Sequence, residues 1–189
     1  MTRARVLASA CRTWILSLTV LMLPLLSHAQ SSATPAGVPT RPRSPCPADA
    51  NRHHFDFWVG EWNVETKDGK PAGRSSVQAI SGGCGLLENW TDNNGGTGKS
   101  INAYNPILGT WQQFWVGEYG AVTEYRESEW RGDTLSFRAT SRASGKPVSL
   151  RLTFNPLPDG SVRQFGEQSA DSGRTWTPTY ELFYRRRAR

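Results

Sequence analysis

Polar and aromatic side chains alternate along three neighbouring segments of the chain. In the first segment, Glu88 and Trp90 are two residues apart. The next two segments carry polar and aromatic residues at the same spacing: Ser100, Asn102 and Tyr104, and then Trp111, Gln113 and Trp115. Residues two apart on a β-strand face the same side of a sheet. If these faces point inward, they form a pocket with aromatic walls and a few fixed polar groups, as small-molecule sites do. The pattern leaves open which face points inward, and ordinary core packing would also produce it.

A later segment and an earlier tryptophan extend this candidate site. Arg163, Gln164 and Glu167 follow one another closely in the later segment, and Trp62 precedes the whole set. The candidate ligand-binding residues are Trp62, Glu88, Trp90, Asn102, Tyr104, Gln113, Trp115, Arg163 and Glu167. We assign no catalytic residue among them.

An enzyme is the second hypothesis. Glu88 and Glu167 would form an acid–base pair if both pointed inward, with burial raising the pKa of one carboxyl. The chain has no Gly-x-Ser-x-Gly motif and no histidine after His54, so no nucleophile–base pair is predicted. A third hypothesis is a structural or interaction protein of the cell envelope, with a filled barrel and no ligand.

One small cluster contains residue types that bind metals. His53, His54 and Asp56 are close in sequence, but adjacent histidines on a strand face opposite sides, and only a turn would bring them together. We interpret the histidines as a solvated pair where the folded domain begins, and predict no metal site.

Turn signals divide the chain after Phe55 into short segments rich in Trp, Tyr, Phe, Val and Thr. Nine signals are present: Asp68-Gly69, Gly82-Gly83, 93–96, 105–109, 117–120, 131–133, Ser144-Gly145, 158–160 and 171–173. They predict about ten strands joined by hairpins. Val148, Leu150, Leu152 and Phe154 alternate with polar residues, as in a half-buried strand. Asp49 is expected to cap a short helical turn over residues 50–54.

Residues 169–176 match the Asp-box pattern Ser-x-Asp-x-Gly-x-Thr-Trp of sialidases and other propellers. In that pattern the Asp side chain bonds nearby backbone N–H groups and the Gly takes a strained conformation. One copy in a short chain predicts a turn, with structural roles for Asp171 and Gly173, and not a glycosidase.

Gly60-Glu61-Trp62 resembles the lipocalin signature, in which the tryptophan closes one end of a barrel. In lipocalins a basic residue of the last strand packs over that ring, and Arg185 or Arg186 stands in the matching place, which implies structural roles for Gly60, Trp62 and Arg185. Residues 55–64, 98–105, 159–164 and 169–176 resemble an uncharacterised family of exported bacterial proteins with a calycin-like barrel, akin to lipocalins and nitrobindin. Nitrobindin-like barrels bind haem through a late histidine, which this chain lacks, so no cofactor is expected.

The N-terminal region predicts export. Residues 1–29 read as a signal peptide, with an arginine-containing start, an apolar run from Trp14 to Leu26, and small residues at the cleavage site. Residues 30–47 are proline-rich and predict a disordered linker, followed by one domain over residues 48–187. Cys46 and Cys84 remain after cleavage and suggest a disulfide in an oxidising compartment, with two unpaired thiols as the alternative.

The charge pattern excludes one class of partner. The net charge is +6 at pH 7, but the excess lies in the leader and in the C-terminal arginines, not on one face. We therefore expect no nucleic-acid partner. We also expect no membrane span in the mature chain, and the oligomeric state stays open.

These features together predict an all-β, calycin-like, antiparallel up-and-down barrel of about ten strands after a short helical turn; a two-sheet sandwich is the rival architecture. The favoured function is an exported, periplasmic or secreted protein that binds a small, partly apolar molecule.

Overall fold

A computed structural model describes residues 46–188. The expected signal peptide and most of the expected linker lie outside these residues. The described chain forms one antiparallel sheet of eleven strands in a nearly closed barrel, which confirms the predicted fold class. The strands are β1 Gly60–Thr66, β2 Pro71–Ile80, β3 Gly85–Asp92, β4 Thr97–Asn105, β5 Thr110–Gly117, β6 Val122–Tyr125, β7 Glu127–Arg131, β8 Thr134–Ala143, β9 Lys146–Pro156, β10 Val162–Ser169 and β11 Thr177–Arg186.

The helical segments are short. They are α1 Ala50–His53 and the 3-10 turns η1 Asp56–Trp58, η2 Ser81–Gly83 and η3 Glu118–Gly120. The Asp49 carboxylate caps α1 by accepting a 3.0 Å hydrogen bond from the Asn51 N–H, as expected. Within residues 46–188, no helix has the length and apolar character needed to cross a membrane.

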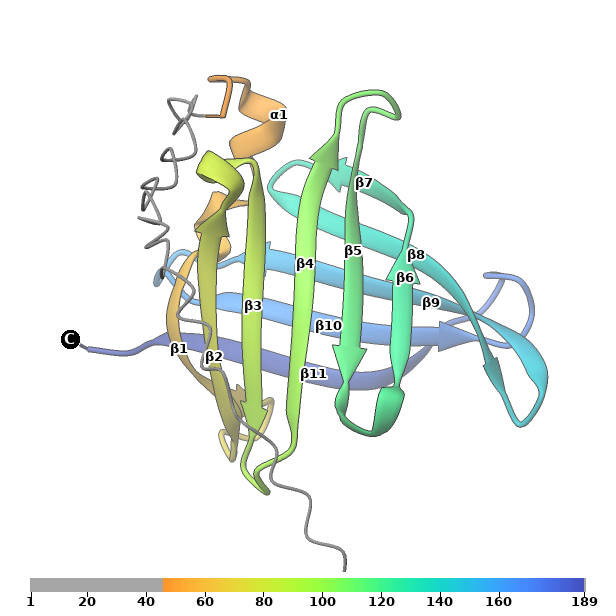
Figure 1. The fold of residues 1–189 in the computed structure, drawn as a ribbon. Helices are drawn as coiled ribbons and strands as arrows, with labels where there is room; N and C mark the ends of the chain where they lie inside the picture. The colour runs from red at the N-terminus through yellow and green to blue at the C-terminus, as the bar shows by residue number, and fades with distance from the viewer. Residues whose placement is uncertain (1–45, 189) are drawn as a thin grey trace, which may run out of the picture. The chain divides into compact units, whose positions relative to one another are not determined.

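Consecutive strands pair as hairpins except β6 and β7, which form the two ends of the sheet order. The first and last strands of the chain, β1 and β11, pair in the middle of this order. In Figure 1 strands β2–β5 stand upright in front, and β8–β11 cross behind them. All nine predicted turns separate the strands that the sequence pattern separates.

The barrel seam explains why eleven strands form where ten were predicted. The predicted strand between Gly120 and Arg131 is split at Arg126 into β6, which pairs with β5, and β7, which pairs with β8. Side chains join β5 to β7 across the seam. The Thr110 and Ser128 hydroxyls lie 2.9 Å apart, and the Ser128 hydroxyl accepts a 2.9 Å hydrogen bond from the Trp111 N–H.

Aromatic side chains fill one end of the barrel. Phe55, Trp58, Trp62 and Trp111 are almost completely buried there, and the Trp62 indole donates a 3.0 Å hydrogen bond to the Trp58 carbonyl. The Arg186 guanidinium lies 4.5 Å from the centre of the Trp62 ring. Trp62 is therefore packed into the filled end of the barrel.

Arg186, and not Arg185, makes this contact with the indole. Successive side chains of a strand point to opposite faces. Arg185 accordingly bonds Asp159 at 2.6 Å on the outside of the barrel. Gly60 has a φ of +153°, a backbone conformation that residues with a side chain rarely adopt, so the position favours glycine.

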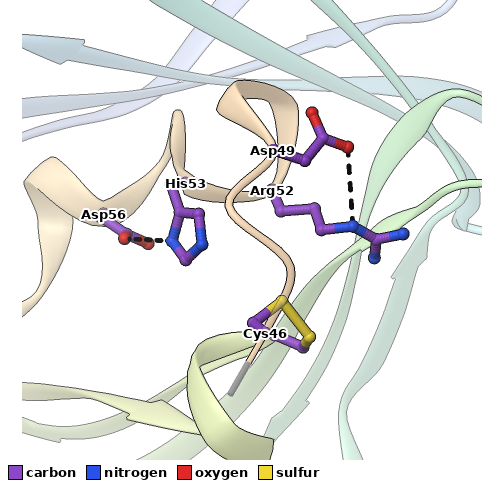
Figure 2. The surroundings of a disulfide bond; sticks show 6 residues. Cys46, Asp49, Arg52, His53 and Asp56 are labelled. Atoms are coloured by element: carbon purple, nitrogen blue, oxygen red, sulfur yellow. Dashed lines mark hydrogen bonds and ion pairs between the residues drawn. A yellow bond between two sulfur atoms is a disulfide. The ribbon is translucent and has the colours of Figure 1, made fainter. Parts of the chain in front are cut away.

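A disulfide joins Cys46 to Cys84 and thus connects the segment before α1 to the start of β3 (Figure 2). Figure 2 also shows His53 turned towards Asp56, 2.8 Å from its carboxylate. The His54 ring instead stacks on Trp130 at 3.6 Å. The two histidines are thus engaged separately, and no metal-binding group of three or more residues occurs within 46–188.

The Asp-box residues form a turn between β10 and β11. Asp171 accepts hydrogen bonds from the Thr175 backbone N–H, the Ser169 hydroxyl and the Thr175 hydroxyl, and these lower its pKa to about 2. Gly173 has a φ of +86°, as this turn requires. The geometry is that of a structural turn.

Candidate ligand-binding cavity

A cavity of about 360 Å³ lies in the barrel lumen. Its walls come from strands on both sides of the seam, namely β3, β5, β6, β9, β10 and β11. The lining residues are Glu88, Trp90, Gln113, Trp115, Thr123, Tyr125, Leu150, Arg151, Leu152, Gln164, Gly166, Glu167, Thr179, Tyr180, Leu182 and Tyr184. Five of the nine sequence-predicted site residues border it: Glu88, Trp90, Gln113, Trp115 and Glu167.

The floor of the cavity is polar and buried. Glu88, on β3, is 3% exposed, and its hydrogen-bond donors come from the neighbouring strands β2 and β4 and from β11. The Ser75 hydroxyl donates to Oε1 at 2.9 Å, and the Ser100 hydroxyl donates to Oε2 at 3.1 Å. The Tyr184 hydroxyl lies 3.1 Å from Oε1. No basic side chain forms an ion pair with Glu88 in the part of the chain that the structure describes.

Amide side chains continue the polar floor. The Tyr184 hydroxyl also lies 3.3 Å from Gln164 Oε1, and its single hydrogen serves one acceptor at a time. On the other side, Asn102 donates to the Ser100 hydroxyl at 3.0 Å and accepts a 2.7 Å bond from Gln113. A connected network of this kind fixes the side chains in one arrangement.

Burial changes the protonation of Glu88. Because desolvation disfavours a charged carboxylate, it raises the Glu88 pKa from 4.5 to about 7, although the three hydroxyl donors act in the opposite direction. The carboxyl group therefore exchanges its proton near neutral pH. Such a group can act as a pH-sensitive binding partner or as a general acid or base.

Three aromatic side chains of the cavity wall each pack closely against a glycine on a neighbouring strand. Trp90 covers Gly73, Trp115 covers Gly98, and Tyr180 covers Gly166, so that a Cβ at each glycine would approach the ring closer than 3.0 Å. Glycine is therefore required at these positions by close approach. The contacts hold the rings in place along the cavity wall.

Three sequence-predicted residues lie around this cavity but do not line it. Trp62 is completely buried in the closed end, where its ring centre lies 6.2 Å from that of Tyr184. Asn102 is completely buried on β4, beside its partner Gln113 on β5. Tyr104 faces inward next to α1, packing near Trp111 and beneath Arg52. These residues support the cavity, but the expectation that they contact ligand is not met by their positions.

Arg163 was placed in the site incorrectly. It precedes Gln164, and neighbouring residues of a strand face opposite sides. Gln164 points into the lumen, so Arg163 lies on the outer face, where it bonds Glu181 at 2.6 Å and covers the Phe165 ring at 4.4 Å.

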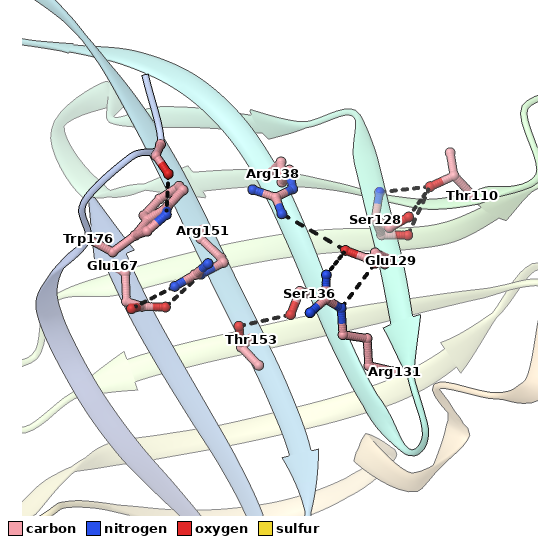
Figure 3. A network of polar contacts seen from close by, with 11 residues as sticks. Thr110, Ser128, Glu129, Arg131, Ser136, Arg138, Arg151, Thr153, Glu167 and Trp176 are labelled. Atoms are coloured by element: carbon pink, nitrogen blue, oxygen red, sulfur yellow. Dashed lines mark hydrogen bonds and ion pairs between the residues drawn. The ribbon is translucent and has the colours of Figure 1, made fainter. Parts of the chain in front are cut away.

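Glu167 borders the cavity, but its carboxylate is held by Arg151. The two side chains form a bidentate pair at 2.7 and 2.9 Å, and Arg151 also lies 4.3 Å above the Trp176 ring (Figure 3). This pair lies on the same side of β9 as Thr153, away from Glu88. The predicted acid–base pair of Glu88 and Glu167 is therefore not formed.

Several lining residues were missed by sequence analysis. Leu150 and Leu152 belong to the alternating face recognised in their segment, and Tyr180, Leu182 and Tyr184 alternate in the last strand. The two-residue spacing in these segments was the signal that could have identified these lining residues. Tyr125 precedes the split at Arg126, and the sequence gives no indication that this residue closes a cavity wall.

Comparison with known proteins does not assign a function to this cavity. No protein-family model matches the chain, and a search of curated proteins finds no significant match.

Proposed function

We propose that the protein is an exported barrel that binds a small, partly apolar molecule in its lumen. The observation that carries this proposal is the 360 Å³ cavity, which has aromatic and aliphatic walls and a buried polar floor. Its volume falls within the usual range for ligand pockets, roughly 300–1,000 Å³. The Cys46–Cys84 disulfide supports an oxidising compartment, and the leader-like N-terminal sequence supports export.

A structural protein without a ligand is less well supported. Such a protein gains stability by filling its lumen, since interiors are normally close-packed. Here the aromatic residues fill only one end of the barrel, and half-buried Trp90, Trp115 and Leu150 border open space at the cavity.

An enzyme is the second candidate, and one observation favours it. Glu88 has a pKa of about 7, which suits a general acid or base at neutral pH. The Glu167 carboxylate is committed to Arg151, so Glu88 would act without a second carboxyl group. Turnover of a bound molecule that disappears in Glu88→Gln, while binding remains, would support this candidate.

The binding proposal is tested with the folded protein and a panel of lipids, aromatic compounds and sugars. A ligand is expected to change tryptophan emission and raise the melting temperature, because Trp90 and Trp115 line the cavity. Leu150→Trp, which fills the cavity, should abolish binding measured by calorimetry. Thr140→Trp, at an exposed position of β8, is the matched control and should leave it unchanged. Absence of any response across the panel would overturn the proposal.

A further inference from the structure

The floor of the cavity is acidic. Glu88 is the one acidic side chain in its floor, and its known partners are three hydroxyl groups. Arg151 is the basic residue on the cavity border, and Glu167 holds it in a bidentate pair. Among residues 46–188, the cavity lining therefore contains no cation that is free to neutralise Glu88.

We propose that the ligand is a small organic cation, whose ammonium group lies beside Glu88 and whose apolar body lies between the aromatic walls. This inference rests on the proposed binding function and names the ligand class. A buried carboxylate without a cationic partner is costly, and a bound cation would remove much of that cost.

The hydrogen bonding of Glu88 leaves room for this partner. An ionised carboxylate offers about four acceptor positions. Ser75, Ser100 and Tyr184 occupy at most three of them. A ligand ammonium can occupy the remaining position, and a quaternary ammonium can lie against the carboxylate by charge alone. An anionic ligand would instead meet Glu88 with like charge.

The aromatic walls favour the same ligand class. Trp90, Trp115 and Tyr180 present rings whose faces attract cations, with tryptophan the strongest. Close packing against Gly73, Gly98 and Gly166 restricts the positions of these rings before a ligand binds. Walls that are already ordered reduce the loss of side-chain conformational entropy on binding. Leu150, Leu152 and Leu182 supply apolar contacts for the rest of the molecule.

The test compares three probes of similar size: acetylcholine, its uncharged carbon analogue 3,3-dimethylbutyl acetate, and hexanoate. At pH 8 we expect the cation to bind the wild-type protein at least about tenfold more tightly than the uncharged analogue, by calorimetry. Hexanoate should bind most weakly. Glu88→Gln keeps the shape of the side chain and should remove the preference for the cation while retaining the uncharged analogue. Glu127→Gln, at an exposed position of β7, is the matched control and should keep the preference.

The pH dependence gives an independent readout. The quaternary probe does not titrate, so its affinity should fall below pH 7 as Glu88 gains its proton, by no more than about tenfold per pH unit, and should level off at the affinity of Glu88→Gln. Tyr125 and Tyr184 also face the cavity, but burial raises their pKa values, so both stay neutral in this range. Arg151 and Glu167, at the border of the cavity, form an ion pair with each other. Affinity in Glu88→Gln should not change over the same range.

The outcomes separate this inference from the proposed function. Equal binding of the cation and its uncharged analogue, or a cation preference that survives in Glu88→Gln, would overturn the cation inference and leave ligand binding intact. If neither these probes nor the wider panel binds, both proposals fail. Circular dichroism and the melting temperature of Glu88→Gln establish that a loss of preference comes from a folded protein.

Discussion

At the scale of single residues, Glu88 occupies a buried position that is unfavourable for an ionised carboxylate but suits the binding of a cation. Its carboxyl group is buried among hydroxyl donors that partly compensate for lost water. They do not compensate fully, because its pKa remains well above that of an exposed glutamate. The ionised form therefore costs folding free energy in the absence of a cation.

This cost predicts a specific dependence of stability on pH. The folded state holds the Glu88 proton up to a pKa of about 7, whereas the unfolded chain releases it near 4.5, so stability falls as pH rises through this window. The contribution is of order 3 kcal/mol between pH 4 and pH 8. Glu88→Gln has no such titrating group. Urea denaturation should therefore show that its unfolding free energy rises by this amount relative to that of the wild-type protein as the pH increases from 4 to 8. Glu127→Gln should show a constant difference, and a constant difference for Glu88→Gln would contradict the raised pKa.

The pairs of glycine and aromatic residues predict a second effect. A methyl group in Gly98→Ala would overlap the Trp115 ring, which must then move, at a cost of about 1–3 kcal/mol in unfolding free energy. In a Trp115→Leu background the ring is absent, so the same substitution should cost much less. Chemical denaturation of the four proteins measures this coupling. Additive effects would mean that the ring does not depend on Gly98 for its place.

At the scale of elements, the seam between β5 and β7 is the place where the barrel lacks a backbone ladder. Figure 3 shows Ser128 facing Thr110, and these side chains replace part of the missing pairing. The seam also borders the cavity wall through Thr123 and Tyr125 of β6. Its local stability therefore bears on access to the lumen.

Ser128→Ala tests the seam. The change leaves the Trp111 N–H without its acceptor, and we expect a loss of about 1–2 kcal/mol in unfolding free energy. Amide hydrogen exchange at Trp111 should accelerate more than exchange in β2 and β3. Ser136→Ala removes a hydroxyl pair with Thr153 on the outer face and should have a smaller effect. Equal exchange rates at Trp111 in the two variants would show that Ser128 does not hold the seam.

The turns and strands show which features of the fold could be predicted from the sequence. The turns were predicted because Gly, Asp and Asn act locally, within two to four residues. The split at Arg126 was not, because it arises where distant strands meet to close the barrel. Within the site, alternation grouped Glu88 with Trp90 and Gln113 with Trp115 correctly. It gave no absolute direction for β10, so Arg163 and Gln164 were both placed in the pocket although only one can face it.

At the scale of the whole molecule, the barrel separates stability from binding. One end is filled by Phe55, Trp58, Trp62 and Trp111, and α1 contributes the Asn51 carbonyl that accepts a 2.8 Å bond from the Trp111 indole. The lumen beyond this packing contains the cavity. The disulfide belongs to the filled end, since it fixes the segment that leads into α1.

Replacing both Cys46 and Cys84 with serine should therefore weaken the fold and spare the cavity. The bridge spans 38 positions, and losing such a loop constraint costs about 3–4 kcal/mol in the chain-entropy treatment. Denaturant unfolding should show this loss in the double variant, and reductant should produce a similar loss in the wild-type protein while leaving the double variant unchanged. Ligand affinity, measured well below the melting temperature, should match wild type because neither cysteine lines the cavity. A folded double variant with weakened affinity would show instead that the filled end controls the shape of the lumen.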